Sequence, residues 1–357
     1  MKIDFLISDL SGGGAQRVMV ILANHFSIKG FDVSLITLNE HKGQSYELNK
    51  SINRIKLHGG IFKNHKIRSL ANLIQYYSIS NNRPDVLISF IHLTNLLAII
   101  TAKIFGIKII VSEHNSHLQI PKPKYLTNFT RNLVYRKADF LTVLTAFDIN
   151  FYKKRKIKVM VMPNPCTFPV LKDNEHIRNK TILAVGSLNR YHHKGFDNLI
   201  RLIKPILNKN SDWKLQIVGG GNKGKKYLSK IVTEEGIKDR VEFIGFTNKV
   251  SKYMKEAAIF ILPSRFEGLP MVLLEAMSQG MACIAYNCKT GPSDILEHMS
   301  NGFLIEDQNT NAMQEGLMTL IENKNLRKKL GDNGLNSLEK FSIENIANKW
   351  EELFNQL

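Results

Sequence analysis

Short apolar runs alternate with longer amphipathic stretches along the first half of the chain. An apolar run of about four to eight residues between polar residues is typical of a strand buried on both faces, and apolar residues at every third or fourth position indicate a helix. The pattern predicts strands at 3–8, 32–37, 86–90, 108–112, 140–144 and 158–162. It predicts helices at 15–28, 67–80, 95–105 and 125–136. This alternation is typical of a parallel sheet covered by helices.

The same alternation restarts in the second half of the chain, after a proline-rich segment. Residues 163–175 contain Pro163, Pro165 and Pro169 with little periodicity, which predicts a linker. Further strands are predicted at 182–186, 214–218, 241–244, 257–262 and 282–285, and helices at 196–207, 225–235 and 271–279. The predicted fold class is α/β, with two doubly wound Rossmann-like domains that face each other across a cleft where ligands bind.

An amphipathic helix is predicted at the end of the chain. Ser342 is a favourable N-cap with Asn345 three residues later, and Ile346, Trp350 and Leu353 share one helical face. The expected organisation is a first domain over 1–165, a second domain over 175–340 and a terminal helix over 341–357.

Composition excludes several classes of protein. The 357 residues suffice for two domains with separate cores, and Cys166, Cys283 and Cys288 lack the spacing of a disulfide framework or a zinc site. The N-terminus lacks the apolar region of a signal peptide, and the longest apolar stretch, Leu93–Val111, is interrupted by lysines and Gly106. We therefore expect a protein of the reducing cytoplasm without a membrane-spanning helix.

Positive charge is concentrated in the first half of the chain. Residues 1–170 hold 23 Lys and Arg against 9 Asp and Glu, whereas the remainder holds 26 against 22. Such asymmetry indicates an extended anionic partner, namely a membrane surface, a diphosphate lipid or a nucleic acid, or else a solvated basic surface. Because zinc-finger spacing and aromatic RNA-binding signatures are absent from the sequence, we expect an anionic membrane surface and no nucleic acid.

Two carboxylates lie around the predicted start of the helix at 271–279. Glu267 falls in the loop after the strand at 257–262, and Glu275 falls inside the helix, whose first turn accommodates Pro270. Ligands of open α/β sheets bind beyond the carboxyl ends of the strands, where a helix N-terminus offers N–H groups to phosphate. An isolated pair at this spacing is common by chance, but carboxylates accept hydrogen bonds from the hydroxyls of a sugar or a ribose.

The residues around this pair closely resemble the signature of retaining GT-B glycosyltransferases of family 4. The resemblance rests on Ser-Arg-Phe-Glu-Gly-Leu-Pro at 264–270, Leu-Glu-Ala-Met at 274–277 and Gly280. It implies an acceptor-binding first domain, a second domain that binds a nucleotide-sugar donor, and a terminal helix that crosses back to the first domain. It also implies that Glu267 holds hydroxyls of the sugar, that Glu275 holds the ribose, and that the donor is bordered by Gly268, Leu269 and Pro270.

A glycine-rich loop follows the first predicted strand. The run Ser11–Arg17 lacks the spacing of a dinucleotide fingerprint, and by itself it equally suits a tight turn that packs helix on strand. The matching loop of the family lies over the donor diphosphate and the reacting sugar, which implies that role for Gly13 and Gly14. Gln16 stands where many relatives carry Glu.

His114 directly follows the strand at 108–112, again at a carboxyl end, so it is expected to point into the cleft. A lone histidine is usually structural. The resemblance implies a different role, since a histidine at this place in the family contacts the transferred sugar near its reacting carbon. The other histidines, including His192 and His193, have no comparable placement in the sequence.

Two cations, Arg190 and Lys194, lie in the loop after the strand at 182–186. They suit a diphosphate leaving group, whose charge grows as the sugar departs, although a solvated basic turn explains them equally simply. The family pattern here is Gly-Arg-x-x-x-x-Lys-Gly. Gly186 and Lys194 match it, whereas Ser187 replaces the arginine and the loop is longer, so Arg190 is the candidate replacement. Gly219 and Phe246 follow the next two strands and resemble family segments that border the nucleotide.

The resemblance implies a hexosyltransferase that retains the anomeric configuration and uses neither a cofactor nor a bound divalent metal. Its catalytic residues are expected to be Glu267, His114, Lys194 and Arg190. The implied donor is a nucleotide diphosphate sugar, with UDP favoured. The chain looks like bacterial N-acetylgalactosaminyltransferases and other hexosyltransferases of lipid-linked oligosaccharide or O-antigen assembly, so the implied acceptor is a polyprenyl-diphosphate-linked saccharide.

Basic and aromatic residues interleave in two segments of the first domain, which suits a bilayer surface. They are Phe62, Lys63, Lys66, Ile67, Arg68, Tyr76 and Tyr77, and Lys122, Lys124, Tyr125, Phe129, Arg131, Tyr135, Arg136 and Lys137. The expected location is the cytoplasm, peripheral on the inner face of the cell membrane. Two alternatives remain: a GT-B sugar-nucleotide epimerase, and a catalytically silent scaffold associated with the membrane.

Overall fold

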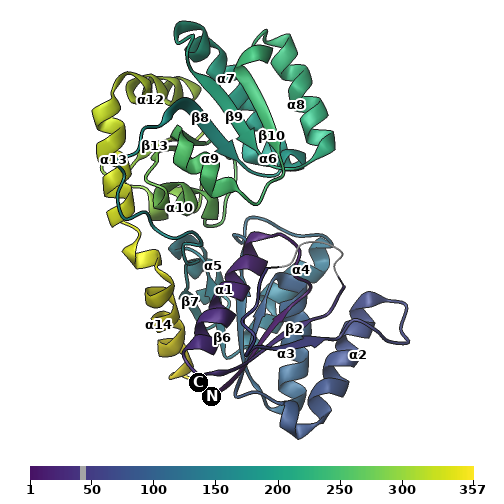
Figure 1. Cartoon of the computed structure of the whole chain (residues 1–357). Helices are drawn as coiled ribbons and strands as arrows, with labels where there is room; N and C mark the ends of the chain where they lie inside the picture. Colours follow the sequence, from purple (N-terminus) through teal and green to yellow (C-terminus); the bar gives the residue numbers. More distant parts are fainter. Residues whose placement is uncertain (41–45) are drawn as a thin grey trace. The chain divides into compact units, whose positions relative to one another are not determined.

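The computed structural model describes residues 1–40 and 46–357 (Figure 1). The described chain forms two compact units. Unit 1 comprises Met1–Pro165 together with Phe341–Leu357, and unit 2 comprises Cys166–Lys340. Each unit is built on its own parallel sheet, which confirms the predicted α/β fold class with two Rossmann-like domains.

Among the described residues, unit 1 has a seven-stranded sheet with the order β3-β2-β1-β4-β5-β6-β7. Its strands are β1 (Lys2–Ile7), β2 (Asp32–Thr37), β3 (Asn53–Lys56), β4 (Val86–Phe90), β5 (Lys108–Glu113), β6 (Phe140–Val143) and β7 (Val159–Val161). The helices are α1 (Gly14–Ile28), α2 (His65–Ser78), α3 (His92–Phe105), α4 (Lys124–Asn132), α5 (Ile149–Lys153) and α14 (Ile343–Phe354). The chain order reverses between β1 and β4, which makes that point the topological switch of the sheet.

The described part of unit 2 has a six-stranded sheet with the order β10-β9-β8-β11-β12-β13. Its strands are β8 (Asn179–Val185), β9 (Lys214–Val218), β10 (Val241–Gly245), β11 (Ala257–Leu262), β12 (Ala282–Asn287) and β13 (Phe303–Glu306). The helices are α6 (Tyr191–Lys194), α7 (Phe196–Lys209), α8 (Asn222–Glu234), α9 (Val250–Glu256), α10 (Met271–Ser278), α11 (Pro292–Ile295), α12 (Thr310–Glu322) and α13 (Lys324–Asn336). Here the order reverses between β8 and β11.

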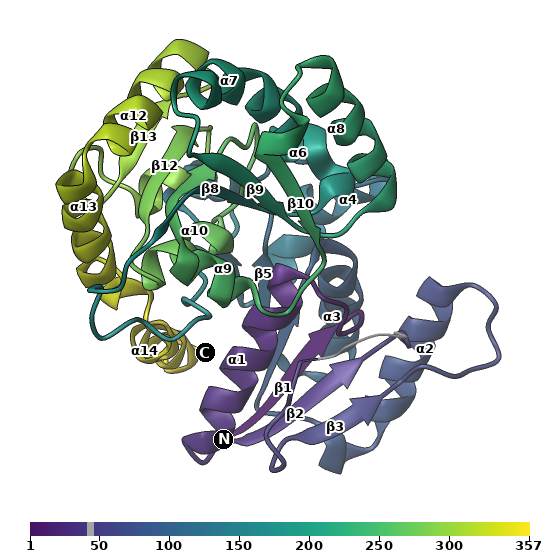
Figure 2. The ribbon, with the colours of Figure 1, turned by 45° about the horizontal axis from the view of Figure 1, so that its top comes forward.

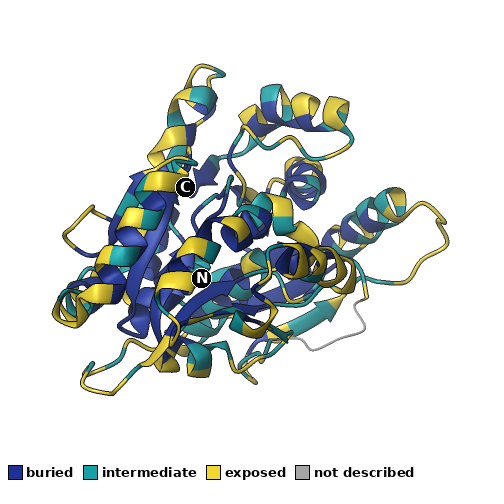
Figure 3. Cartoon of the chain, turned by 90° about the horizontal axis from the view of Figure 1, so that it is seen from above, coloured by how far each residue is buried: buried dark blue, intermediate teal, exposed yellow. Residues whose placement is uncertain are grey.

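One central strand of each sheet is buried along its whole length, as its continuous apolar run predicts. Every residue of β4 and of β11 is buried. The helices that cover the sheets are buried on one side only, so Figure 3 shows dark blue strands and helices banded with exposed yellow turns. In α7, for example, Leu199, Ile203 and Ile206 face the core. The sequence pattern therefore reflects burial directly.

The terminal helix α14 belongs to unit 1, where it lies beside α1 (Figures 1 and 2). The Ser342 hydroxyl accepts a hydrogen bond from the Asn345 N–H at 3.1 Å, so the predicted N-cap is confirmed. The ring of Trp350 lies 6.3 Å from that of Phe90, and Phe354 lies 5.5 Å from Phe26. The last residues of the chain thus complete the core formed by the first domain.

Several elements differ from the predictions. The predicted helix over 125–136 is wrong at its end, because α4 stops at Asn132 and a 3₁₀ turn follows at Val134–Lys137. That turn buries the Tyr135 side chain, whose hydroxyl bonds to Glu113. The short strands β3 and β13 and the helices α12 and α13 were not predicted. The strands are too short, and the helices contain too many polar residues, for their sequences to be distinguished from loops.

Candidate active site

Lys194 and Glu267, two of the residues predicted to act on the donor, lie at the topological switch point of unit 2. Strands β8 and β11 are neighbours at the centre of the sheet, and the chain leaves them in opposite directions across the sheet. Lys194 lies in the loop and short helix after β8, and Glu267 lies in the loop after β11. Open α/β sheets bind ligands at this position, so the topology places both side chains where a ligand is expected.

Lys194 and Glu267 form an ion pair. Lys194 Nζ lies 2.8 Å from Glu267 Oε1, and the Ser264 hydroxyl donates to the same oxygen at 2.6 Å. The pair is mostly buried, with the Lys194 side chain 14% and the Glu267 side chain 8% exposed. The loop after β12 joins this arrangement, since the Thr290 hydroxyl donates to the Glu267 backbone carbonyl at 2.5 Å. The loops after three strands therefore hold Glu267, two of them through its carboxylate and the third through its backbone carbonyl.

Glycine is required where these loops meet. Gly195 follows Lys194 with a φ of +71°, and a β-carbon there would lie 1.9 Å from the carbonyl oxygen of Pro263. Gly186 is less constrained, since a β-carbon there would lie 3.2 Å from the Phe196 ring and 3.4 Å from the Lys194 side chain. The loops after β8 and β11 thus pack backbone against backbone, which holds Lys194 close to Glu267.

A second set of contacts joins the same two loops. Arg265 pairs with Asp197 through Nη1 at 2.7 Å and Nη2 at 3.2 Å, and the Arg265 N–H donates to the His193 carbonyl at 3.0 Å. Arg190 donates from Nη2 to His193 Nε2 at 2.9 Å, and the His193 ring lies against that of Phe266. Burial, aided by the charge of Arg190, lowers the pKa of His193 to about 4.

The N-terminus of α10 opens next to Glu267. Pro270 occupies its N-cap position, and no side chain of the described residues caps it. The first N–H groups of such a helix are available to an anion. A β-carbon on Gly291 would lie 2.2 Å from the Gly268 carbonyl oxygen, so the loop after β12 presses on the start of this helix. Leu269 is buried beneath it.

Glu275 lies inside α10 and is 5% exposed. Its Oε1 accepts a hydrogen bond from the Thr167 hydroxyl at 2.5 Å. A carboxylate is an acceptor with two oxygens, which is the chemistry that the hydroxyls of a ribose require. The sequence did not predict that Thr167 contacts Glu275, or that Ser264 and Thr290 contact Glu267. Thr167 and Thr290 are far from their partners in the sequence, and Ser264 belongs to no pattern that indicates a contact.

The glycines after β9 have a structural explanation that the sequence did not reveal. A β-carbon on Gly219, whose φ is +156°, would lie 1.8 Å from the Gly186 carbonyl oxygen. Gly224 approaches the Leu188 carbonyl equally closely. Glycine at these positions therefore permits the segment after β9 to contact the loop after β8, independently of any ligand. Phe246, after β10, is 77% exposed, as a residue available to a ligand must be.

The remaining predicted residues belong to unit 1. Gly13 is the N-cap of α1, and Gly14 is its first residue. The Gly13 carbonyl accepts a bond from the Tyr46 hydroxyl at 3.3 Å, and Gln16 Nε2 donates to the Ser11 hydroxyl at 3.2 Å. These contacts close a compact turn at the carboxyl end of β1.

His114 follows β5 and packs on Phe90, with the ring centroids 4.3 Å apart. Its Nε2 is buried and has no hydrogen-bond partner within the described part of the chain. Burial lowers the pKa of His114 to about 3, so the imidazole is neutral at physiological pH. Beside it Ile91 has a φ of +75°, which is unusual for a β-branched residue. A neutral imidazole with an unused nitrogen is suited to a hydrogen bond with a sugar hydroxyl.

The residue before His114 is part of a buried support. Glu113 pairs with Arg131 at 3.0 Å and accepts a hydrogen bond from the Tyr135 hydroxyl. Arg131 also donates to the carbonyls of His117 and Gln119 at 3.0 Å each. The prediction that Arg131, Tyr135 and Tyr77 face a membrane is therefore wrong, since all three side chains are buried. Each occurs on an amphipathic segment but turns inward to a carboxylate: Tyr77 donates to Asp4.

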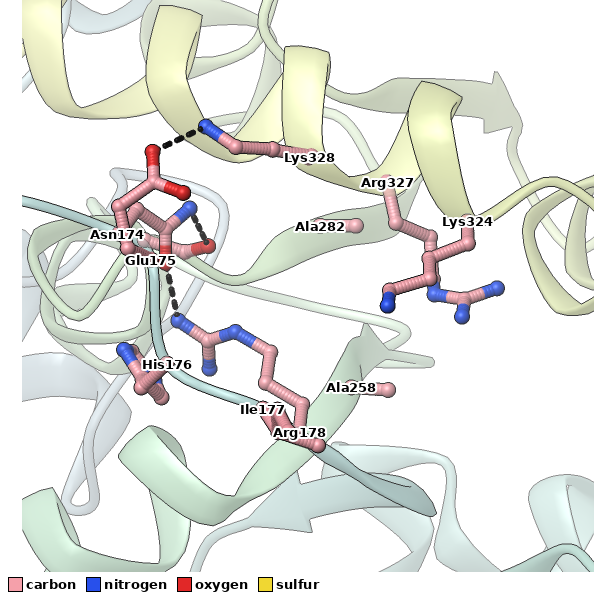
Figure 4. A pocket seen from close by; sticks show the side chains of 11 residues that line it. Asn174, Glu175, His176, Ile177, Arg178, Ala258, Ala282, Lys324, Arg327 and Lys328 are labelled. Carbon is pink, nitrogen blue, oxygen red and sulfur yellow. Dashed lines mark hydrogen bonds and ion pairs between the residues drawn. The ribbon is translucent and has the colours of Figure 1, made fainter.

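A cavity of about 170 Å³ lies at the opposite, amino-terminal edge of the unit 2 sheet (Figure 4). Arg178 lines it and donates to the carbonyls of Ala257 at 3.0 Å and Gln279 at 2.5 Å. Lys328 pairs with Glu175 at 3.0 Å and with Asp332 at 2.9 Å. Arg178 thus joins the segment that enters unit 2 to β11 and to the end of α10, and Lys328 joins it to α13, so we interpret both cations as structural.

Two further observations concern the whole described chain. Within residues 1–40 and 46–357, no group of three or more His, Cys, Asp or Glu side chains is placed to hold a metal ion. The helices described here are all too short or too polar to cross a membrane.

Comparison with known families matches both halves of the chain. Residues 12–166 match the family described as Glycosyltransferase Family 4, and residues 171–337 match Glycosyl transferases group 1. An uncharacterized glycosyltransferase of Haemophilus influenzae is 32% identical over 98% of this chain and 99% of its own.

A relative from Campylobacter jejuni is 31% identical over all of this chain and 99% of its own. It is an alpha-1,4-N-acetyl-D-galactosaminyltransferase named for the acceptor GalNAc-alpha-(1->4)-GalNAc-alpha-(1->3)-diNAcBac-PP-undecaprenol. Among solved structures, TarM of S. aureus, in complex with Fondaparinux, alpha-GlcNAc-glycerol and UDP, has a TM-score of 0.81 at 16% identity and covers 99% of both chains. Such structural likeness shows that the fold is GT-B.

Proposed function

Because the chain belongs to glycosyltransferase family 4 and is a glycosyltransferase, we propose that it moves a hexose or N-acetylhexosamine from a UDP-sugar to a polyprenyl-diphosphate-linked saccharide. The observation that carries the donor half of this proposal is the Lys194–Glu267 pair at the switch point of unit 2. The acceptor half is supported by the name of the Campylobacter relative, whose acceptor is linked through a diphosphate to undecaprenol.

The proposed roles follow from the chemistry of each group. Lys194, Arg190 and the N-terminus of α10 neutralise the diphosphate, whose charge grows as the bond to the sugar breaks. Removal of one such donor typically costs roughly 3 kcal/mol of transition-state stabilisation. Glu267 holds sugar hydroxyls, and its ion pair with Lys194 links the sugar to the phosphate within one network. Glu275 accepts hydrogen bonds from the ribose.

We assign retention of configuration and independence of metal to the same proposal. The acceptor hydroxyl attacks on the face from which the diphosphate leaves, and the departing phosphate oxygen accepts the hydroxyl proton. The C–O bond to the diphosphate breaks as the new glycosidic bond forms, and no other reactant is consumed. Lys194 and Arg190 supply the positive charge that a divalent metal supplies elsewhere. Turnover that requires Mg²⁺ or Mn²⁺ after treatment with EDTA would contradict this part.

The acceptor is proposed to be reached at the inner face of the cell membrane. Two exposed apolar groups stand among lysines in unit 1: Ile61, Phe62 and Ile67 beside Lys63 and Lys66, and Tyr125 and Phe129 beside Lys122 and Lys124. Tyr125 is 76% exposed on the outer face of α4. Aromatic side chains sit well at the headgroup level, and lysines are attracted to anionic lipids. Binding to anionic vesicles at low salt is the expected result.

The decisive experiment is calorimetric titration of the purified protein with UDP and with GDP, repeated with Glu275→Ala. The proposal predicts that UDP binds and that the substitution weakens its binding by about tenfold, since hydrogen bonds to charged groups contribute roughly 1.5–3 kcal/mol. If GDP binds tightly and UDP does not, the proposed donor becomes a GDP-sugar. If neither nucleotide binds, the donor site is wrong and a scaffold role becomes the better explanation.

A further inference from the structure

His193, for which the sequence pattern predicted no role, contacts Arg190, one of the proposed phosphate-binding cations. Arg190 ends a 3₁₀ turn at Leu188–Arg190, and His193 lies one turn later in α6. Arg190 Nη2 and His193 Nε2 are 2.9 Å apart. Arg190 is otherwise exposed at the surface of unit 2, so this bond is the feature that distinguishes it from a freely moving arginine.

The direction of this hydrogen bond is fixed by chemistry. A guanidinium group only donates, so His193 Nε2 must accept, which requires a neutral ring with its proton on Nδ1. The low pKa of His193, about 4 and caused first by burial and then by Arg190, agrees with that form at physiological pH. His193 directly precedes Lys194 in α6, and Lys194 pairs with Glu267, so the bond lies one residue along the chain from that ion pair.

The acceptor nitrogen is itself held in place by the neighbouring loop. The His193 carbonyl accepts from the Arg265 N–H at 3.0 Å, and its ring packs on Phe266 with centroids 5.8 Å apart. Arg265 is anchored by two bonds to Asp197. His193 therefore presents a fixed acceptor to a long side chain that would otherwise occupy many rotamers.

We infer that His193 is a positioning residue, which holds Arg190 beside Lys194 so that both cations meet the diphosphate of the donor. This inference rests on the proposed function. An unrestrained arginine loses rotamer freedom when it binds phosphate, and a partner that orders it beforehand removes part of that cost. The inference also explains how a chain with Ser187 in place of the family arginine keeps two ordered cations in this loop.

The test compares binding of UDP and uridine, which differ by the diphosphate, to a set of variants. His193→Phe keeps an aromatic ring against Phe266 but removes the acceptor, whereas His193→Gln keeps an acceptor oxygen. The expected result is a roughly three- to tenfold loss of UDP affinity in His193→Phe, the range that immobilising one side chain covers, with uridine binding unchanged. His193→Gln should recover most of the loss. His176→Gln, at an exposed histidine of unit 2 that contacts the Lys255 carbonyl, is the control and should bind UDP as the unaltered protein does.

The decisive comparison is made in the absence of Arg190. In an Arg190→Ala background, His193→Phe should have no further effect, because the interaction that it removes is already lost. The inference is overturned if His193→Phe binds UDP normally, if it weakens uridine equally, or if its effect persists without Arg190. Failure of the proposed function has a different signature: the unaltered protein would then bind UDP no better than uridine, and the inference would fall with it.

Discussion

Each unit contains a buried ion pair at the carboxyl end of its sheet, and the two pairs differ in what surrounds them. In unit 2, Lys194 and Glu267 keep 14% and 8% of their side chains exposed. In unit 1, Arg131 and Glu113 are each 2% exposed, and Glu113 has an additional donor in Tyr135. Arg131 also donates to two backbone carbonyls. One pair is reachable by a ligand, and the other is enclosed.

The difference in exposure and in the number of partners indicates that one pair binds a ligand and that the other supports the fold. A buried pair must recover the hydration that both charges lose, and it does so through geometry and further hydrogen bonds. The unit 1 pair is bonded on several sides, so its function is to fix the loop that follows Glu113, where His114 lies. The unit 2 pair has fewer partners and lies at a switch point, so a ligand is able to exchange for part of its contacts. Chemical type alone does not distinguish the two.

The largest expected effect comes from breaking the enclosed pair. Arg131→Met leaves Glu113 buried without its cation, which typically costs about 3–5 kcal/mol of stability. Urea unfolding should show this loss. Arg136→Met, the same change at an exposed position five residues later, is the control and should change stability little. The double variant Glu113→Leu with Arg131→Met should recover much of the loss. An unaltered urea midpoint in Arg131→Met would show that the pair is not a support.

The reachable pair should respond in activity rather than in stability. Glu267→Gln keeps the shape of the side chain but removes its charge, and we expect kcat to fall by roughly 100-fold or more while nucleotide affinity changes less. Glu242→Gln is the control, because Glu242 pairs with Lys214 at 3.3 Å on the surface of the same unit. Surface pairs contribute about 0–1 kcal/mol, so this variant should behave normally. If Glu267→Gln instead unfolds the protein without a specific loss of kcat, the Lys194–Glu267 pair is a structural support and not a binding group.

The sequence predicted the reachable pair better than the enclosed one for a physical reason. Glu267 lies in a motif flanked by a buried strand, Pro270 and Gly280, so both the loop and the helix could be predicted locally. Arg131 lies 18 residues after Glu113 on an amphipathic helix, where a cation usually faces solvent. His193 was missed similarly, since its role depends on a loop that follows β11. Local pattern predicts elements, whereas contacts between distant elements depend on the three-dimensional packing.

His114, whose buried Nε2 has no hydrogen-bond partner among the described residues, provides a third case, and its effect on stability is measured by lowering the pH. The folded-state pKa of His114, about 3, lies below its ordinary value of 6.5, so its contribution to stability is complete above pH 6.5 and is lost as the pH falls. Between about pH 7 and pH 5 the loss should be about 2 kcal/mol. His114→Phe keeps the packing on Phe90 and should remove this part of the dependence of stability on pH.

The titration of Asp4 also changes stability with pH, and its effect has the opposite sign to that of His114. Burial raises the pKa of Asp4 to about 6, so its contribution is complete below pH 3.8 and is lost as the pH rises through 6. The informative quantity is therefore the difference in urea midpoint between the unaltered protein and His114→Phe at each pH. Parallel pH profiles for the two proteins would show that His114 is protonated in the folded state.

Glu275 is expected to have an intermediate position between support and binding group, since it is buried and accepts a hydrogen bond from the Thr167 hydroxyl but lies inside the helix that opens at the proposed donor site. Glu275→Ala should weaken UDP binding by about tenfold, or about 1.4 kcal/mol, with a smaller effect on turnover at saturating donor. Glu315→Ala, at an exposed position of α12, is the control. A change confined to kcat would indicate that Glu275 acts on the transferred sugar instead of the nucleotide.

The smallest expected effect concerns α4, the helix that carries the enclosed Arg131 near its end and the exposed Lys124 at its start. Lys124→Gln should reduce binding to anionic vesicles at low salt by about fivefold, since each lysine near such a surface contributes about 1 kcal/mol. Stability and UDP binding should be unchanged, because Lys124 is exposed and belongs to unit 1. Co-sedimentation with vesicles of anionic and of neutral lipid measures the effect, and Lys137→Gln, an exposed lysine beyond α4, tests whether position on the helix matters. If both variants lose binding equally, the attraction reflects the net charge of unit 1 and not a docking face on α4.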